Sequence, residues 1–314
     1  MTDVLTFGEA MVSLRADQPV RTGGALRMSV AGAEANVAIG LARLGHRVRW
    51  IGLTGTDELG ALVLRTLRAE NVDTSHAAQA DGPTGLVVFE PRIADLTRVS
   101  YYREASAGSR LIPAHIEPSL KQGARIVHTT GITAALGRGA LDAVEAAVRS
   151  APAAGATVCL DVNYRSKLWS PEQAAAALRP LTPHVDVLVA SEDELALAAP
   201  AGAVGEAGQV QALLECGVRE VVVKRGAEGA EVFDASGATA QRAVAVTVRD
   251  TVGAGDAFVA GYLSALLDGE PVAGRLRRAV AVGAFAVASS GDWEGLPTRE
   301  DLTLLRAAPG SAIR

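Results

Sequence analysis

The stretch Asp250-Thr251-Val252-Gly253-Ala254-Gly255-Asp256 is the part of the 314-residue chain that says most about its fold. It follows an alternating β-branched run, 244–248, which predicts a strand, and it precedes an apolar run, 257–267, which predicts a helix. Small residues at such a junction let successive backbone N–H groups turn toward one point at the helix N-terminus, where the macrodipole favours negative charge. The stretch therefore predicts an anion site with Asp256 beside it, in the first helical turn.

A carboxylate beside an anion site suits group transfer better than simple binding. Asp256 can take a proton from a hydroxyl while the backbone amides of Gly253, Ala254 and Gly255 hold the charge that develops on a phosphoryl group. An ordinary helix cap with a glycine turn and an acidic first turn would also explain these residues. The short glycine motif by itself leaves both interpretations open.

Composition limits the class of protein. The length and a hydrophobic content of 49% predict a globular α/β protein with a sizeable core, and a net charge of −5 without a basic block argues against a nucleic-acid partner. Cys159 and Cys216 predict buried reduced thiols, and neither His128 nor His184 has a spacing that suggests a metal site. Because no apolar run of about 18 residues lacks polar breaks and the chain opens on a strand-like run, we expect no membrane span, no signal peptide and a cytoplasmic location.

Strand and helix patterns alternate along most of the chain. Strands are predicted at 4–7, 48–53, 126–129, 157–160, 185–189 and 220–224, with a hairpin from 230. Helices are predicted at 56–68, 140–148, 257–267 and 279–289, with another ending at 44. This alternation predicts an α/β protein with a mainly parallel sheet covered by helices.

Four short runs do not fit that alternation: 11–14, 26–30, 85–90 and 98–103, and no crossover helix lies between the last two. They predict a small separate sheet. We therefore expect one domain over 1–314, with lid strands inserted from about 10–30 and 85–104.

A second motif lies at 31–38. Gly32 allows a ligand close to the backbone, and Asn36 offers a donor and an acceptor one turn into the next helix, although a plain helix start with a solvated Asn36 would also fit. Together the two motifs, in this order and roughly 220 residues apart, resemble the two signatures of the ribokinase-like (PfkB) carbohydrate kinases. The resemblance covers 4–305.

The resemblance implies a three-layer α/β/α fold with a small β-sheet lid, and transfer of the γ-phosphoryl group of ATP to a hydroxyl of a sugar or sugar acid. It implies Asp256 as the base and the amides of Gly253, Ala254 and Gly255 as the anion hole. It also implies Mg²⁺, with a monovalent cation as an option, and we expect a homo-oligomer. The sugar site would comprise Gly32, Ala33, Asn36, Val87, Tyr101, Arg103, Ile132, Arg165, Asp256 and Asp292. The nucleotide site would comprise Asn163, Arg165, Ser191, Lys224, Gly226, Gly229, Gly253, Ala254 and Gly255.

Some positions depart from the family pattern or allow a second explanation. Ser191 replaces an asparagine that relatives often carry on the magnesium side of the triphosphate, whereas Glu194 is kept and is expected to act on the metal through water. An acidic helix start would also explain Glu194. Asp161 could have a structural hydrogen-bonding role or a functional one, and the adenine contact near Val280 lacks the asparagine of some relatives.

Within the family the chain is most similar to 2-keto-3-deoxygluconate kinases, through 8–10, 31–34, 101–103 with 106–109, and 161–165 with 168–171. Arg103 and Arg165 would suit an acidic acceptor because guanidinium binds carboxylates bidentately, although Arg103 alone could be a solvated arginine on an edge strand. Val87 lies where such kinases can place a lid tyrosine. Phosphorylation of 2-keto-3-deoxygluconate to 2-keto-3-deoxy-6-phosphogluconate is therefore expected, with fructokinase or a related sugar kinase as the alternative. A sugar-responsive binding protein on a kinase fold is a third reading, which the intact Asp256 disfavours.

Overall fold

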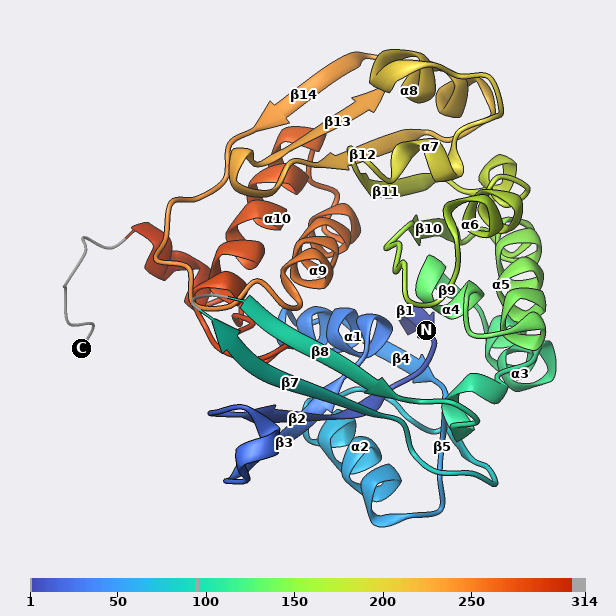
Figure 1. The fold of residues 1–314 in the computed structure, drawn as a ribbon. Helices are drawn as coiled ribbons and strands as arrows, with labels where there is room; N and C mark the ends of the chain where they lie inside the picture. The colour runs from blue at the N-terminus through green and yellow to red at the C-terminus, as the bar shows by residue number, and fades with distance from the viewer. Residues whose placement is uncertain (1, 94–95, 307–314) are drawn as a thin grey trace.

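An eight-stranded sheet forms the middle of three layers in the computed structural model, which describes residues 2–93 and 96–306 (Figure 1). Its strand order is β14-β13-β12-β11-β10-β9-β1-β4. Six neighbouring strands are parallel: β1 Thr2–Phe7, β4 Val48–Ile51, β9 Ala124–Thr130, β10 Thr157–Asp161, β11 Val187–Ser191 and β12 Glu220–Lys224. An antiparallel hairpin, β13 Ala230–Asp234 and β14 Gly237–Gln241, forms one edge. The predicted mainly parallel sheet is confirmed.

Helices cover both faces of this sheet, which explains why successive residues of its parallel strands are buried. In β12, for example, Val221, Val222 and Val223 are all buried, as expected for a parallel strand covered on two sides. On one face lie α1 Ala33–Arg43, α2 Glu58–Ala69, α9 Ala254–Leu267 and α10 Val272–Val287. On the other lie α3 Pro113–Gln122, α5 Arg138–Ser150, α6 Pro171–Leu178, α7 Leu195–Ala198 and α8 Gly205–Glu215, with the short α4 Gly131–Ala134 at the end of β9.

The remaining elements are short. Leu53–Thr54 (β5) and Ala78–Gln79 (β6) form a two-stranded ladder, so the predicted strand 48–53 is divided between β4 and β5. Single 3₁₀ turns occupy Val20–Thr22, Ala107–Arg110, Pro152–Ala154, Thr182–His184, Gly226–Glu228 and Asp301–Arg306. Within the described part of the chain, no helix has both the length and the apolar character needed to cross a lipid bilayer.

The lid is a separate four-stranded sheet in the order β3-β2-β7-β8, as the four short runs predicted. Its strands are β2 Met11–Ala16, β3 Leu26–Ala31, β7 Leu86–Ile93 and β8 Leu96–Tyr102. Met11, Ala31, Val87 and Phe89 form a small apolar cluster on one face of this sheet. That face is turned toward the carboxyl ends of the parallel strands, so the lid covers the place where open α/β sheets bind ligands.

The strand predicted at 244–248 is wrong. Residues 242–248 pair with no strand, and the chain instead runs beside the C-terminal end of α10, where Arg249 N donates to Val287 O at 2.7 Å. Val244 packs on the apolar core, whereas Val248 is exposed. The alternation of β-branched residues therefore reflects a half-buried surface, which a helix can provide as well as a neighbouring strand.

Candidate active site

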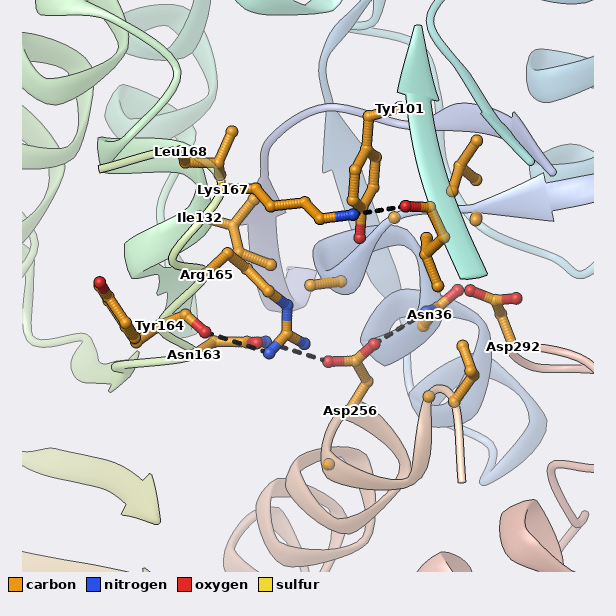
Figure 2. A pocket seen from close by; sticks show the side chains of 18 of the residues that line it. Asn36, Tyr101, Ile132, Asn163, Tyr164, Arg165, Lys167, Leu168, Asp256 and Asp292 are labelled. Carbon is orange, nitrogen blue, oxygen red and sulfur yellow. Dashed lines mark hydrogen bonds between the residues drawn. The ribbon is translucent and has the colours of Figure 1, made fainter. Parts of the chain in front are cut away.

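A cleft of about 900 Å³ lies between the lid and the carboxyl ends of the parallel strands. Its walls come from the lid, the start of α1, the loop after β10, the ends of β11 and β12, and the N-terminus of α9 (Figure 2). The cleft opens near β1, from which the sheet continues to β4 on one side and to β9 on the other. Such a reversal of strand order is the usual ligand-binding point of an open α/β sheet.

The N-terminus of α9 supplies the predicted anion site. Gly253 caps the helix with a φ of 74°, and a Cβ there would lie 2.0 Å from the carbonyl oxygen of Asp292, so only glycine fits. The amide of Ala254 donates to Thr251 O at 3.3 Å, whereas first-turn amides such as those of Gly255 and Asp256 have no acceptor within a helix. A Cβ added to Gly255 would lie 3.7 Å from Nζ of Lys224, which places an ammonium beside the same turn.

Asp256 is the buried acid beside the anion turn, with 8% of its surface exposed. Its Oδ2 accepts from Nδ2 of Asn36 at 2.8 Å, and its Oδ1 accepts from Nδ2 of Asn163 at 3.3 Å. Burial raises the pKa of Asp256 to about 6, and the charge of Asp161 adds to this, while the Asn36 hydrogen bond and the charges of Arg165 and Lys224 oppose it. The side chain is thus an oriented carboxylate whose pKa is close to neutral, as a general base requires.

The end of β10 positions two of these groups. Asn163 has a φ of 39°, a left-handed conformation that asparagine tolerates, and it reaches Asp256 from this turn. Asp161 is 1% exposed, and its Oδ1 accepts from Nζ of Lys224 at 2.8 Å. Asp161 therefore holds Lys224 in place, and Lys224 itself lines the cleft.

Glu194 lines the cleft, but both of its carboxylate oxygens accept backbone hydrogen bonds. Oε1 accepts from Tyr164 N at 2.7 Å and Oε2 from Ser191 N at 2.8 Å, so Glu194 joins the loops that follow β10 and β11. Residues 2–93 and 96–306 contain no group of three His, Cys, Asp or Glu side chains that could hold a metal ion. This donor set suits an Mg²⁺ ion that arrives with phosphates and keeps its waters, because each oxygen of Glu194 retains a second lone pair.

At the lid end of the cleft, Arg103 forms an ion pair with Glu9, whose Oε1 also accepts from Oγ of Ser106 at 2.5 Å. Glu9 is almost completely buried, at 3% exposure. The guanidinium of Arg103 also lies 5.6 Å from the centroid of the Tyr101 ring, on the same side of the lid, as alternation along the strand predicted. Val87 and Ile132 line the same cleft. Arg103 is therefore not a solvated edge arginine.

Sequence reasoning missed Arg15, a residue of lid strand β2. Its guanidinium donates to Asp250 at 2.5 Å and to Asp292 at 2.7 Å, and it lies 4.2 Å from the centroid of the Phe89 ring. Burial raises the pKa of Asp292 to about 6, and Arg15 opposes that rise. No local pattern could have revealed contacts that span 235 and 277 residues of sequence.

Sequence reasoning also missed Lys167. It lies two residues after Arg165, and its Nζ donates to Val99 O on lid strand β8. The available signal was a second basic residue close to Arg165, in the loop that the family resemblance places at the substrate.

Most predicted site residues line this one cleft: Gly32, Ala33, Asn36, Val87, Tyr101, Arg103, Ile132, Asn163, Arg165, Ser191, Glu194, Lys224, Gly253, Gly255, Asp256 and Asp292. Three predicted positions are not among its lining residues: Ala254, Gly226 and Gly229. Gly226 and Gly229 lie in the turn between β12 and β13. A Cβ on Gly229, whose φ is 111°, would lie 2.0 Å from Gln241 O, so the chain itself requires that glycine. His128 is a buried core histidine: burial lowers its pKa to about 3, and its Nδ1 lies 2.9 Å from Oγ1 of Thr6.

Residues 1–299 match the pfkB family of carbohydrate kinases. The 2-dehydro-3-deoxygluconokinase of Bacillus subtilis is 36% identical over 98% of this chain and 96% of its own length, and that of Thermoproteus tenax is 38% identical over 98% and 95%. Among solved structures, a candidate ribokinase II from E. coli in complex with ATP and Mg²⁺ superposes with a TM-score of 0.90 at 25% identity, covering 98% of this chain and 99% of that one.

Proposed function

The chain belongs to the pfkB family of carbohydrate kinases, and from that premise we propose that it phosphorylates 2-keto-3-deoxygluconate, also named 2-dehydro-3-deoxygluconate, at the expense of ATP. The product would be 2-keto-3-deoxy-6-phosphogluconate. The observation that carries the reaction is the buried Asp256 carboxylate, held by Asn36 and Asn163 at the N-terminus of α9. The choice of acceptor is supported by the names of the two relatives, each more than a third identical over nearly the whole chain.

In the proposed reaction the acceptor hydroxyl lies against Asp256. The hydroxyl oxygen forms a bond to the γ-phosphorus while the bond from that phosphorus to the bridging oxygen of ADP breaks, and Asp256 takes the hydroxyl proton. A pKa of about 6 leaves most of the Asp256 carboxylate ionised at neutral pH and ready to accept it. The first-turn amides of α9 and the ammonium of Lys224 offset the charge on the transferred group.

The nucleotide side of the proposal uses the other end of the cleft. We assign Asn163, Arg165, Ser191 and Lys224 to the phosphates of ATP, and Mg²⁺ enters with those phosphates as part of the substrate. A relative of the same fold solved with ATP and Mg²⁺ supports this assignment. Glu194 would fix the loops around the metal and could reach it through water.

A monovalent cation is an option that the family resemblance leaves open, and a comparison of initial rates in K⁺ and in tetramethylammonium buffers would test it. A cytoplasmic location, where a kinase meets ATP, is part of the same proposal.

The acceptor is tested by a screen in which ADP release is coupled to NADH oxidation. Candidates are 2-keto-3-deoxygluconate, 2-keto-3-deoxygalactonate, fructose and ribose, each with the Asp256→Asn variant as the blank. We expect the highest kcat/KM for 2-keto-3-deoxygluconate. A preference for fructose would replace the proposal with fructokinase. ADP release that no candidate stimulates, combined with tight sugar binding, would favour the non-catalytic binding protein.

We also propose that the protein is a homo-oligomer that uses the lid face turned away from the cleft. Leu26 and Met28 on edge strand β3 and Tyr102 on the opposite edge strand β8 share that face, and they are 43%, 52% and 65% exposed, which is a large apolar exposure for one face of a small sheet. Light scattering after gel filtration should give a mass of at least two chains, and Met28→Asp should lower it. A monomeric parent protein would end this part of the proposal.

A further inference from the structure

Four cationic side chains line the cleft, and they differ in whether the protein neutralises them. Lys224 is paired with Asp161, and Arg103 is paired with Glu9. For Arg165 and Lys167, no ion pair with a carboxylate within 4.0 Å is found among residues 2–93 and 96–306. Two positive charges of the cleft are therefore left for ligands to neutralise.

Lys167 lies at the lid end of the cleft. Its side chain extends from the loop after β10 toward Tyr101, as Figure 2 shows, and its Nζ donates to Val99 O and lies 5.7 Å from the centroid of the Tyr101 ring. The guanidinium of Arg103 lies 5.6 Å from the same ring centroid. Two cations thus meet at one aromatic ring, and Glu9 balances only one of them. An ammonium has three N–H donors, so the bond to Val99 leaves two for a ligand.

Arg165 serves a different end of the cleft. Figure 2 shows its guanidinium directed toward Asp256, and its charge is one of the influences that lower the pKa of that carboxyl. An arginine beside the reacting hydroxyl and the anion turn is placed to meet phosphate. The carboxylate of an acidic acceptor must then find its counter-charge elsewhere.

We propose that Lys167 binds the carboxylate of an acidic acceptor and thereby selects sugar acids over neutral sugars, an inference that rests on the function proposed above. In 2-keto-3-deoxygluconate the carboxylate and the terminal hydroxyl are at opposite ends of the carbon chain. When the hydroxyl lies at Asp256, the carboxylate extends away from it, and Lys167 and Tyr101 stand on the lid side of the cleft. The carboxylate there balances the second cation, and Lys167, bonded to a lid strand, holds acceptor and lid together.

The same lysine could simply fasten the lid to the core through Val99, and the two roles differ in a measurable way. A fastening role affects every acceptor, because the lid closes over all of them. A carboxylate-binding role affects only acceptors that carry the charge. The matched pair of acceptors is 2-keto-3-deoxygluconate and its methyl ester, which have the same carbon chain and the same reacting hydroxyl.

The experiment measures kcat and KM of the parent and of Lys167→Met on both acceptors, with Lys167→Arg as the charge-conserving variant. Lys121→Met, on the exposed side of α3, controls for loss of a lysine elsewhere. We expect Lys167→Met to lower kcat/KM on the free acid by about 10- to 50-fold, mainly through KM, and on the ester by less than about threefold. Lys167→Arg should recover most of the loss, and Lys121→Met should change neither value.

An equal loss on acid and ester would overturn the inference in favour of the lid-fastening role, and so would an unchanged kcat/KM on the acid. Neither result touches the proposed function, which the parent enzyme alone decides in the acceptor screen. If the parent prefers another sugar acid, that acid and its ester replace the pair and the inference is tested as before. If the parent accepts only neutral sugars, both the proposed acceptor and this role of Lys167 are wrong.

Discussion

Asp256 is the single residue on which turnover depends most directly. Asp256→Asn keeps the shape of the side chain but cannot accept a proton, so we expect kcat to fall by about 10²–10⁴-fold. ATP binding, measured by calorimetry, should change little, because the phosphate contacts remain. A variant with kcat within about threefold of the parent would show that another group is the base.

The fold of this variant can be checked at the same time. Because burial raises the pKa of Asp256 in the folded state from a usual 3.8 to about 6, the folded protein binds this proton more tightly than the unfolded chain does. The contribution of this group to stability is therefore fully present below pH 4 and is lost as pH rises through about 6, so its charge weakens the fold at pH 7. The Tm of Asp256→Asn at pH 7 should be no lower than that of the parent, which separates lost chemistry from lost structure.

The pH dependence of the rate tests the environment of the same carboxyl. We expect the acidic limb of kcat/KM to bend near pH 6 in the parent. Asn36 stabilises the ionised form through its 2.8 Å hydrogen bond, so Asn36→Ala should move this limb to higher pH by roughly one unit. Asp292, whose pKa is also about 6, provides the contrast: Asp292→Asn should lower the rate and shift the limb slightly to lower pH, the opposite direction to Asn36→Ala, because the charges of Asp292 and Asp256 repel each other. If the acidic limb moves in Asp292→Asn but not in Asn36→Ala, the titrating group is Asp292 and not Asp256.

Individual residues could be predicted where local sequence decides their place. Asp256, Gly253 and Asn36 belong to motifs in which a turn and a helix start fix the geometry. The ion pair between Arg103 and Glu9 could not be predicted, because it depends on how the lid folds back over the end of β1. Lys167 needed the same information, since only the folded lid brings Val99 and Tyr101 to it.

At the scale of one element, the turn before α9 makes two glycines necessary for different reasons. Gly253 has a positive φ and no room for a Cβ, so Gly253→Ala should lower Tm by roughly 5–10 °C. Gly255 is not among the residues with positive φ, and the nearest atom to an added Cβ is Nζ of Lys224, at 3.7 Å. Gly255→Ala should therefore fold normally but lower kcat at least about tenfold, because its methyl group occupies the anion site. Thermal unfolding and steady-state rates on this pair check both statements, and full activity of Gly255→Ala would place the anion site elsewhere.

The elements that could be predicted are those that are buried on both faces or along one regular stripe. The parallel strands are buried on two faces, and α5 buries one regular stripe that includes Ala140, Val144 and Val148, so hydrophobic pattern alone identifies them. Sequence pattern predicts no helix over α3 or α8. Pro118 lies inside α3, and Gly205 and Gly208 lie in the first turns of α8, so local propensity opposes both helices and packing against the sheet overrides it.

For the whole molecule, the lid matters because it must close over an acceptor and then release the product. Arg15 is the clearest link between the lid and the core, because this residue of lid strand β2 forms ion pairs with Asp250 and Asp292. Asp250 in turn accepts from the amide of Val252 at 3.0 Å, next to the anion turn. These ion pairs could not be predicted from local sequence, because Arg15 lies near one end of the chain and Asp250 and Asp292 lie near the other.

We expect Arg15→Met to loosen the lid and to destabilise the protein in a pH-dependent way. Removing one partner from a largely buried ion pair costs about 3–5 kcal/mol, which corresponds to a fall in Tm of roughly 5–15 °C. Arg15 lowers the pKa of Asp292, so without Arg15 this pKa rises above about 6 and the carboxyl is neutral at lower pH. A neutral Asp292 needs no counter-charge, and the deficit in Tm should therefore be larger at pH 8 than at pH 5.5. The KM for the acceptor should rise more than kcat falls, because a loose lid weakens binding first.

Arg27 provides a matched control, because it lies directly opposite Arg15 in the β2–β3 ladder and is exposed. Arg27→Met removes the same charge from the same sheet, so its Tm and KM should stay close to those of the parent at both pH values. If Arg15→Met and Arg27→Met change Tm and KM alike, the effect comes from losing any arginine of the lid sheet and not from the ion pairs of Arg15. If the deficit of Arg15→Met is the same at pH 5.5 and pH 8, the ion pair with Asp292 does not link lid and core. If the fall in Tm is smaller at pH 5.5 than at pH 8 only in Arg15→Met, and the KM of that variant is raised, then the ion pair between Arg15 and Asp292 holds the lid to the core.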